Sequence, residues 1–131
     1  MNNLGAAIIM SLKGTPFWQA GEEMLRTKDG DENSYKSSDA INNIDWSVLK
    51  EGTIQYETMQ YYKGLIAFRK AHGALRMTTA EETKANITTM TGLDANVMAF
   101  KINGGVNGEV ADNLFVIFNA NETETEITLP E

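Results

Sequence analysis

The spacing of hydrophobic residues changes near Leu75 and divides the chain into two regions. Before this point, apolar residues recur at helical spacing in residues 2–13 and 53–71. After it, they occur in short runs at residues 87–90, 97–102, 114–118 and 125–129. Helical spacing predicts helices, whereas short β-branched and aromatic runs between turn residues predict strands. The pattern therefore predicts an α+β chain whose second part is antiparallel, with a boundary between Gly73 and Thr78.

The two predicted helices differ in their apolar surface. The first can be capped by Asn2 or Asn3, is apolar nearly all round and should be deeply buried. The second is amphipathic, with an acid in its first turn and basic residues in its last, and Gly73 ends it. Gly14 is a suitable residue to follow the first helix.

Between these helices lies a short apolar segment, residues 16–20, which opens on a Gly-Thr-Pro turn and closes on Ala-Gly. Such a run predicts a strand buried on both faces, as in a parallel sheet, with polar chemistry just past its carboxyl end. A parallel strand needs neighbours on both sides, and the sequence does not supply them. The segment therefore predicts that the chain is a piece of a larger enzyme.

The second part resembles half of a β-sandwich. A Gly- and Asn-rich loop at residues 103–108 joins the second and third predicted strands as a hairpin. In the fourth, Thr125, Ile127 and Leu129 alternate with polar residues. Four strands make one layer of a sandwich, so we expect an all-β domain that is incomplete at the C-terminus.

Composition narrows the classes of ligand. The 131 residues carry a net charge of −7, which argues against nucleic-acid or anionic-membrane partners and suits neutral ligands such as sugars. Cysteine is absent, so disulfides and thiolate chemistry are excluded and the compartment stays open. The first apolar segment is too short to span a bilayer and lacks a basic region before it.

Glu22 and Glu23 form a tempting carboxylate pair. Glycoside hydrolysis needs two carboxyl groups about 5–10 Å apart on either side of the scissile bond. Neighbouring residues on a strand point to opposite faces, so this pair fits a structural role better.

Residues 26–43 form a long polar loop, and loops of this length are often functional. Tyr35 could stack on a sugar ring and Asn33 could bond its hydroxyls, while Trp18 fits a core position better. The loop opens like a calcium site at Asp29 but lacks the required glycine and glutamate. His72, the only histidine, fits a helix end, so no metal site is predicted.

Three segments carry a resemblance to a known family: residues 14–28, 32–39 and 41–46. In this order they resemble the end of the catalytic barrel of type I pullulanases, debranching enzymes of the α-amylase superfamily. Residues 62–72 resemble the last barrel helix, although this chain has Gly73 where the family often has proline. Beyond about residue 76 the similarity is to the family's C-terminal β-sandwich.

The resemblance implies a fold and an activity. Residues 1–74 would be the end of a (β/α)8 barrel, with its seventh helix, eighth strand (residues 15–20) and eighth helix, and residues 75–131 would begin the all-β domain. The family performs retaining hydrolysis of α-1,6-glucosidic branch linkages in pullulan, starch or glycogen, with no cofactor and no metal taking part in the chemistry. Its three catalytic carboxylates lie on strands that have no counterpart here, so we expect no catalytic residue in this chain.

The same resemblance assigns the candidate site residues. Asn33, Ser34 and Tyr35 would contact the α-glucan, and Arg26, Asp39 and Glu23 would support their loop. A stand-alone carbohydrate-binding or accessory module, or an α+β domain without a ligand, remains an alternative. Because isolated barrel elements expose apolar surface, we also expect a homo-oligomer or an exchange of elements between copies.

Overall fold

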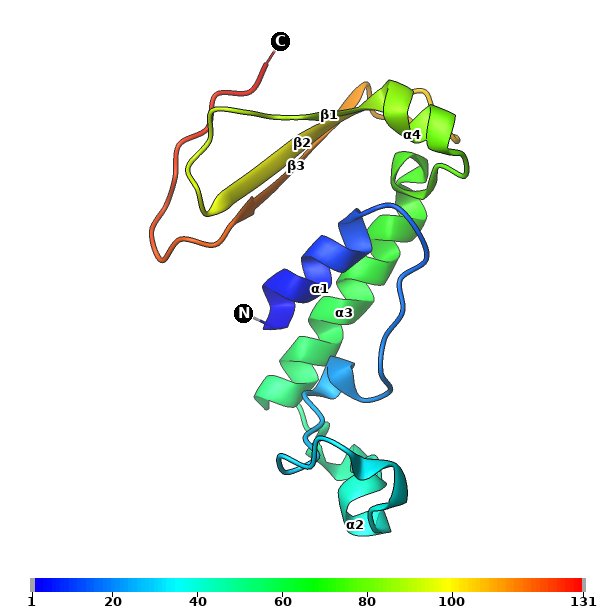
Figure 1. Ribbon diagram of the computed structural model, residues 1–131, viewed down its shortest axis with the longest axis vertical. Helices are drawn as coiled ribbons and strands as arrows, with labels where there is room; N and C mark the ends of the chain where they lie inside the picture. Colours follow the sequence, from blue (N-terminus) through cyan, green and yellow to red (C-terminus); the bar gives the residue numbers. More distant parts are fainter. Residues whose placement is uncertain (1, 131) are drawn as a thin grey trace. The chain divides into compact units, whose positions relative to one another are not determined.

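The computed structural model describes residues 2–130, which form helices, single helical turns and one antiparallel sheet (Figure 1). The chain divides into two compact units: Pro16–Leu65 is one, and the residues before and after it form the other. We call the first the loop unit and the second the sheet unit. The predicted boundary between residues 74 and 75 falls inside the sheet unit and stays a prediction about domains.

Both predicted long helices are confirmed. Helix α1 spans Asn2–Ser11 and helix α3 spans Ile54–Ala71, with the last turns of α3 in the sheet unit. Arg69 joins the two, because its guanidinium donates to the carbonyl oxygens of Met10 at 2.7 Å and Gly14 at 2.7 Å. Met10 lies in the last turn of α1 and Gly14 after its end, where backbone carbonyls lack partners within the helix, so the arginine satisfies them.

The sheet contains three strands in the order β1–β2–β3, which are Ile87–Thr89, Val97–Asn103 and Asn113–Asn119. Both pairings are antiparallel, as predicted. The predicted fourth strand, residues 125–129, is wrong, because this segment has no strand structure. Asn121 explains the difference: its side chain bonds Asp94 and Asn96, which directs the chain along the β1–β2 loop instead of along β3.

The core lies on one face of this sheet. It gathers apolar side chains from the turn Gly73–Arg76, from Met77 and from strands β2 and β3, and partly buried residues of α1 pack against it. Leu75 and Ile102 are completely buried. The expected burial of α1 on all sides is wrong, because Ile9 and Leu12 are each 41% exposed. Only one side of α1 meets the core.

Two short helices were not predicted: α2 (Asp39–Asn42), within the polar loop, and α4. Helix α4 spans Ala80–Asn86, and the Thr79 side chain caps it by accepting from the Glu82 backbone N–H at 3.1 Å. The Glu82 carboxylate in turn accepts from the backbone N–H of Thr78. This Thr-x-x-Glu arrangement resembles a capping box and was the available sequence signal.

The loop unit lacks the predicted strand at residues 16–20, which have no strand structure. Phe17 in this segment is 89% exposed. A parallel strand forms only by hydrogen bonding to neighbours, and the described residues offer none to this segment. Trp18 is half-buried and packs on Tyr62 of α3 with ring centroids 5.1 Å apart, so it lies at the margin of the unit.

The remaining elements of the loop unit are short. Helix α2 spans Asp39–Asn42, and single helical turns span Glu22–Met24, Ser34–Lys36 and Trp46–Val48. Asp45 caps the last of these turns by accepting from the Ser47 backbone N–H. Among the described residues, no helix has the length and apolar content needed to cross a bilayer.

Candidate functional site

Arg26 holds together the two ends of the long polar loop. Its side chain donates to the carbonyl oxygens of Ala20 at 3.1 Å and Asn43 at 3.1 Å, and also to that of Asn42. Gly21 makes room for it, because a Cβ atom there would lie 2.6 Å from the arginine side chain. Gly21 also has a φ of 98°, which favours glycine. Arg26 therefore links the two ends of this loop, and its role as a support of glucan-binding residues stays a prediction.

A second cluster fixes the middle of the loop. The Lys28 ammonium donates to the Ser34 hydroxyl at 2.6 Å and to the Asn42 side chain at 3.1 Å. The Asn42 amide then donates to the backbone carbonyls of Ser34 at 2.7 Å and Ser37 at 3.0 Å. These bonds replace the missing regular secondary structure, since each buried backbone oxygen needs a partner.

Asp31 closes the turn that carries Tyr35. Its carboxylate accepts from the Ser37 hydroxyl and from the Asn33 backbone N–H at 3.0 Å. The bond from Ser37, with that from Asn33, lowers the pKa of Asp31 below its ordinary value, so the carboxylate is ionised at neutral pH. Asp31 therefore has a structural role here, in place of the calcium ligand that the sequence superficially suggested.

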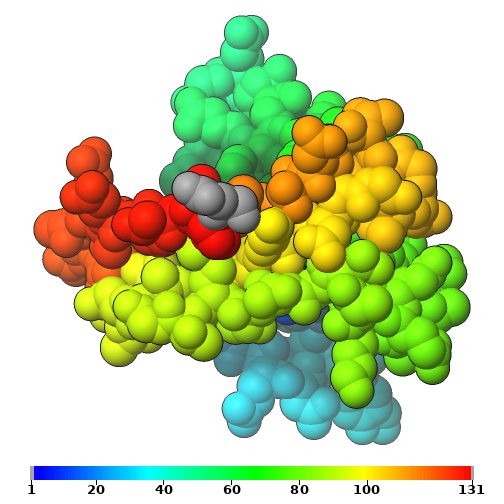
Figure 2. Space-filling model, turned by 90° about the horizontal axis from the view of Figure 1, so that it is seen from above, coloured from blue at the N-terminus to red at the C-terminus, as the bar shows by residue number. Residues whose placement is uncertain are grey.

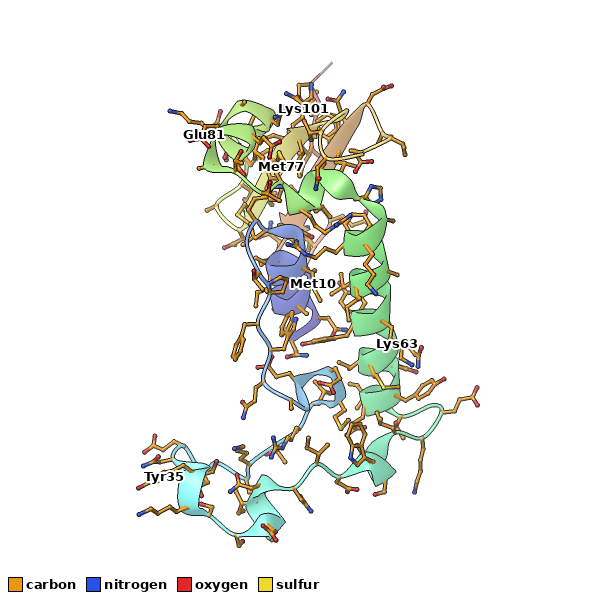
Figure 3. All side chains as sticks on the ribbon, turned by 90° about the vertical axis from the view of Figure 1, so that its right-hand side faces the viewer. Met10, Tyr35, Lys63, Met77, Glu81 and Lys101 are labelled. Carbon is orange, nitrogen blue, oxygen red and sulfur yellow. The ribbon has the colours of Figure 1, made fainter. Side chains whose placement is uncertain are left out.

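The three residues predicted to contact the glucan differ in exposure. Tyr35 is 75% exposed, its side chain projects from the loop in Figure 3, and the Lys36 ammonium lies 5.3 Å from its ring centroid. Asn33 is also exposed. Ser34, by contrast, is buried and its hydroxyl is engaged by Lys28. Their role in glucan binding stays a prediction.

The two acidic supports occupy different positions. Glu23 lies in the helical turn Glu22–Met24, not beside a strand, and its carboxylate accepts from the backbone N–H of Gly21 at 3.0 Å. Asp39 occupies the first turn of α2 and is exposed. Glu23 thus stabilises the backbone that leads into Arg26.

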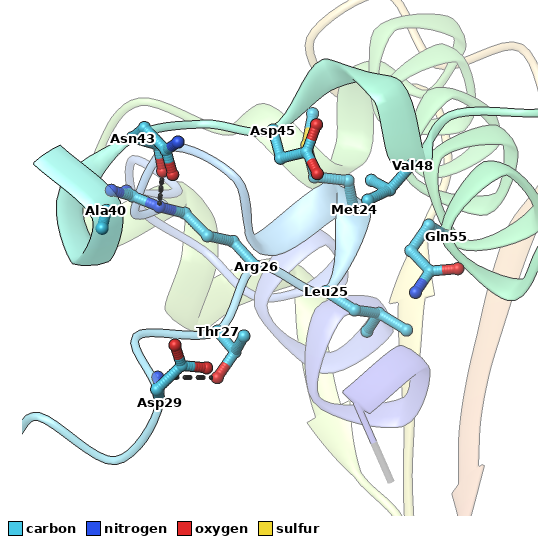
Figure 4. A pocket seen from close by; sticks show the side chains of 10 residues that line it. All are labelled: Met24, Leu25, Arg26, Thr27, Asp29, Ala40, Asn43, Asp45, Val48 and Gln55. Atoms are coloured by element: carbon cyan, nitrogen blue, oxygen red, sulfur yellow. Dashed lines mark hydrogen bonds between the residues drawn. The ribbon is translucent and has the colours of Figure 1, made fainter.

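A pocket of about 350 Å³ opens beside Arg26 (Figure 4). Its polar side chains come from both ends of the loop and from the first turn of α3. Its lining residues are Met24, Leu25, Arg26, Thr27, Asp29, Ala40, Asn43, Asp45, Val48 and Gln55. Carboxylate and amide groups over an apolar floor suit a small polar ligand with several hydroxyls.

Asp45 limits what this pocket can do chemically. Its carboxylate accepts from the Ser47 hydroxyl at 2.6 Å and from the Ser47 backbone N–H at 2.9 Å. These bonds lower the pKa of Asp45, so it is ionised at neutral pH and cannot donate a proton to a leaving group. Among residues 2–130, no three metal-binding side chains gather in one place. Asp45 therefore offers the pocket a hydrogen-bond acceptor at neutral pH.

Sequence reasoning missed Lys28, Asn42 and Gln55 as parts of this site. Lys28 and Asn42 bond each other across 14 positions of the loop, which no local pattern shows. Gln55 lies at the start of α3, where its helix was predicted but its neighbours were not. The only signal was the unusual density of amide and short polar side chains between residues 26 and 43.

Comparison with known proteins shows which proteins this chain resembles. Residues 84–131 match the family model described as "Pullulanase, all-beta domain". The chain is also 30% identical over 145 residues to the isoamylase of a Flavobacterium species, covering 96% of this chain and 18% of that protein. The predicted resemblance to pullulanases is thereby confirmed.

Particular relatives make the similarity more specific. The pullulanase of Bacillus subtilis strain 168 is 36% identical over 127 residues, which are 97% of this chain and 17% of that protein. The solved pullulanase from Bacillus acidopullulyticus superposes with a TM-score of 0.91 at 36% identity, covering 99% of this chain and 16% of that one. The pullulanase of Paenibacillus barengoltzii in complex with maltohexaose and α-cyclodextrin gives a TM-score of 0.90 at 36% identity, covering 98% of this chain and 19% of that one. The chain thus spans less than a fifth of these relatives.

Proposed function

We propose that this chain is a non-catalytic portion of a pullulanase-type glycoside hydrolase that cleaves α-1,6-glucosidic branch linkages in α-glucans. In this proposal, residues 1–74 complete the catalytic (β/α)8 barrel and residues 75–131 begin the C-terminal β-sandwich domain. The observation that carries it is similarity over 97% of this chain to only 17% of the Bacillus subtilis pullulanase.

The segment at residues 16–20 supports the assignment to a barrel. It contains a strongly exposed Phe17 and a half-buried Trp18, which is unusual for a run of this composition. Neighbouring barrel strands would bury both faces of this segment and supply its backbone hydrogen bonds. Its lack of strand structure here is then a consequence of missing neighbours.

The loop after this segment supplies the glucan contacts in our proposal. Tyr35 offers an exposed ring on which a glucose unit can stack, and Asn33 offers an amide for its hydroxyls. Ser34 holds the loop from its buried side, and Arg26, Glu23 and Asp39 support it from its ends. The chain would therefore help to position substrate and leave bond cleavage to other parts of the enzyme.

Two assays test this proposal. First, the chain alone is incubated with pullulan, and we expect no release of reducing ends; clear turnover would overturn the non-catalytic assignment. Second, the chain replaces the matching 127 residues of the Bacillus subtilis pullulanase. We expect the chimera to hydrolyse pullulan, and Tyr35→Ala in the chimera to raise KM about tenfold with a smaller change in kcat, because a lost stacking contact costs about 1–1.5 kcal/mol.

We further propose that the isolated chain self-associates or exchanges elements between copies. Phe17, Trp46 and Ile54 of the loop unit are 89%, 64% and 64% exposed, and burial of such side chains drives association. Sedimentation velocity over a range of concentrations should show dimers or larger species. A single monomeric species at the highest concentration would refute this part of the proposal.

A further inference from the structure

The outer face of the sheet, opposite the core, carries an unusual row of side chains. Side chains alternate between the faces of a strand, so Lys101 points away from the core that its neighbours Phe100 and Ile102 help to form. Thr88 of β1 and Phe115 of β3 lie directly opposite Lys101 in the two pairings. The Lys101 ammonium lies 5.9 Å from the centroid of the Phe115 ring.

Together with the C-terminal residues, Thr88 and Lys101 of this row line a hollow. Instead of pairing as a strand, residues 128–130 lie beside β1 and its following loop, and the hollow between them measures about 540 Å³. Figure 2 shows these last residues, in red, beside the yellow-green and yellow residues of β1 and β2. The lining residues are Thr88, Thr89, Met90, Thr91, Lys101, Asn103, Thr128, Leu129 and Pro130. We call this hollow the sheet groove.

The polar side chains of the sheet groove are free to bind a ligand. Thr89 alternates with Thr88 along β1 and pairs with Phe100, so its side chain lies on the core face of the sheet. Within the described residues, the hydroxyls of Thr88, Thr91 and Thr128 and the Asn103 amide make no side-chain hydrogen bond. Lys101 makes no hydrogen bond or ion pair there, and its ammonium lies over the Phe115 ring. In the loop unit, by contrast, Arg26 and Lys28 donate five hydrogen bonds to groups of the protein itself. A polar group that is not engaged in folding is available for recognition.

The chemistry of the groove selects a neutral, hydroxyl-rich ligand. Among the residues that the structure describes, its lining includes no acidic residue, although the chain has 18, and Lys101 is the only cation there. One cation gives little affinity for an anion in a chain of net charge −7. Hydroxyl and amide groups both donate and accept, as sugar hydroxyls do, while Met90, Leu129 and Pro130 offer apolar surface to the C–H face of a sugar ring.

We infer that the sheet groove is a second α-glucan-binding site, separate in its residues from the polar loop, which takes a few consecutive glucose units. The choice of glucan rests on the proposed function, whereas the location rests on the sheet. Such a site would hold a neighbouring branch of the polymer and raise the local concentration of substrate.

To test this, maltohexaose is titrated into the full chain and binding is monitored by two-dimensional NMR. We expect shifts in the backbone signals of Thr88, Lys101 and Thr128. Thr88→Val and Lys101→Met should each weaken this binding at least fivefold. Both positions are on the sheet surface and valine suits a strand, so the variants should keep the fold, which their spectra without ligand will verify. Thr123→Val and Lys70→Met, which remove the same groups outside the groove, should bind like the unaltered chain.

The outcomes separate this inference from the proposed function. Absence of any maltohexaose-induced shift in the sheet signals would overturn the sheet groove and would leave the chimera assay to decide the proposed function. Binding that Tyr35→Ala abolishes, but that Thr88→Val and Lys101→Met leave unchanged, would overturn the groove while favouring the polar loop. Binding lost in the two groove variants and kept in Tyr35→Ala supports the inference.

Discussion

The sheet unit and the loop unit are stabilised in different ways. In the sheet unit, apolar side chains from distant parts of the chain meet in one core, and Leu75 and Ile102 are completely buried. In the loop unit, few large side chains are buried, and order comes from hydrogen bonds that converge on Arg26, Lys28 and Asn42. Hydrophobic burial stabilises the first, whereas directional polar contacts hold the second.

The difference predicts that the two units respond differently to substitution. The sheet unit has its own core and needs few outside contacts to keep its shape. The loop unit has exposed apolar side chains at Phe17 and Trp46, and its backbone between residues 15 and 20 lacks regular structure. Substitutions in the sheet unit should therefore cost global stability, while those in the loop unit should act locally.

The largest effect is expected from Ile102→Ala. The side chain is fully buried in the core, and truncation of a buried isoleucine costs about 2–5 kcal/mol in lost burial and cavity formation. Urea denaturation followed by circular dichroism should show a large fall in the midpoint. Phe17→Ala, at a position that is 89% exposed, is the control and should change stability little. Equal effects of the two substitutions would contradict the assignment of the core to the sheet unit.

Gly73→Ala should have the next largest effect. A Cβ atom at Gly73 would lie 1.9 Å from the carbonyl oxygen of Asn107, so the backbone of the β2–β3 loop would have to move. We expect a loss of about 2–3 kcal/mol in the free energy of unfolding, typical of overpacking. Gly64→Ala, in α3, is the matched control. A Cβ atom at Gly64 would meet no atom beyond its own stretch of helix within 4 Å. This variant should gain about 0.5–1 kcal/mol in the free energy of unfolding. A neutral Gly73→Ala would refute the close approach.

Arg26→Ala should loosen the loop unit alone. It removes the donors to the carbonyls of Ala20, Asn42 and Asn43, and we expect a local loss of about 1–2 kcal/mol because these groups can bond water instead. Hydrogen exchange should accelerate about tenfold in amides of residues 21–43 and stay unchanged in β2 and β3. Lys36→Ala is the control. It also removes a positive charge from the loop, but not one that links the loop ends, so hydrogen exchange in residues 21–43 should change little. Faster exchange throughout the sheet would show that the units are not independent.

The smallest effect concerns pH and tests the sheet unit. The buried Glu109 carboxylate accepts from the backbone N–H groups of Val110 and Ala111, each at 3.0 Å, and lies 3.2 Å from the His72 ring nitrogen Nδ1. The Ala111 bond is the main cause that lowers the pKa of Glu109 below its ordinary value.

A carboxylate whose pKa is lowered by folding contributes stability above its unfolded pKa, and this contribution is lost as the pH falls through the folded value. The chain should therefore lose stability below pH 4.5, the ordinary pKa of glutamate. Glu109→Gln should be less stable at neutral pH and show a flatter dependence of melting temperature on pH in this range. If the slope of melting temperature against pH is unchanged in Glu109→Gln, the role of Glu109 is refuted. Glu126→Gln, on the exposed C-terminal segment, is the control and should behave like the unaltered chain.

Local patterns in the sequence determined the helices and most of the strands. The apolar periodicity of residues 53–71 predicted α3 almost to its ends, because it is amphipathic and bounded by residues that end helices. The runs at residues 97–102 and 114–118 form β2 and β3, because the two strands are neighbours in the sequence and pair with each other as a hairpin.

Tertiary structure decided the features that depend on distant partners. Residues 16–20 and 125–129 have strand-like sequences, yet neither forms a strand, because a strand exists only where another offers its hydrogen bonds. The convergence of Lys28, Ser34 and Asn42, and the row of Thr88, Lys101 and Phe115, likewise follow from loop closure and sheet register. Sequence by itself supplied the residue types for recognition, and only long-range pairing determined which of them face a common ligand.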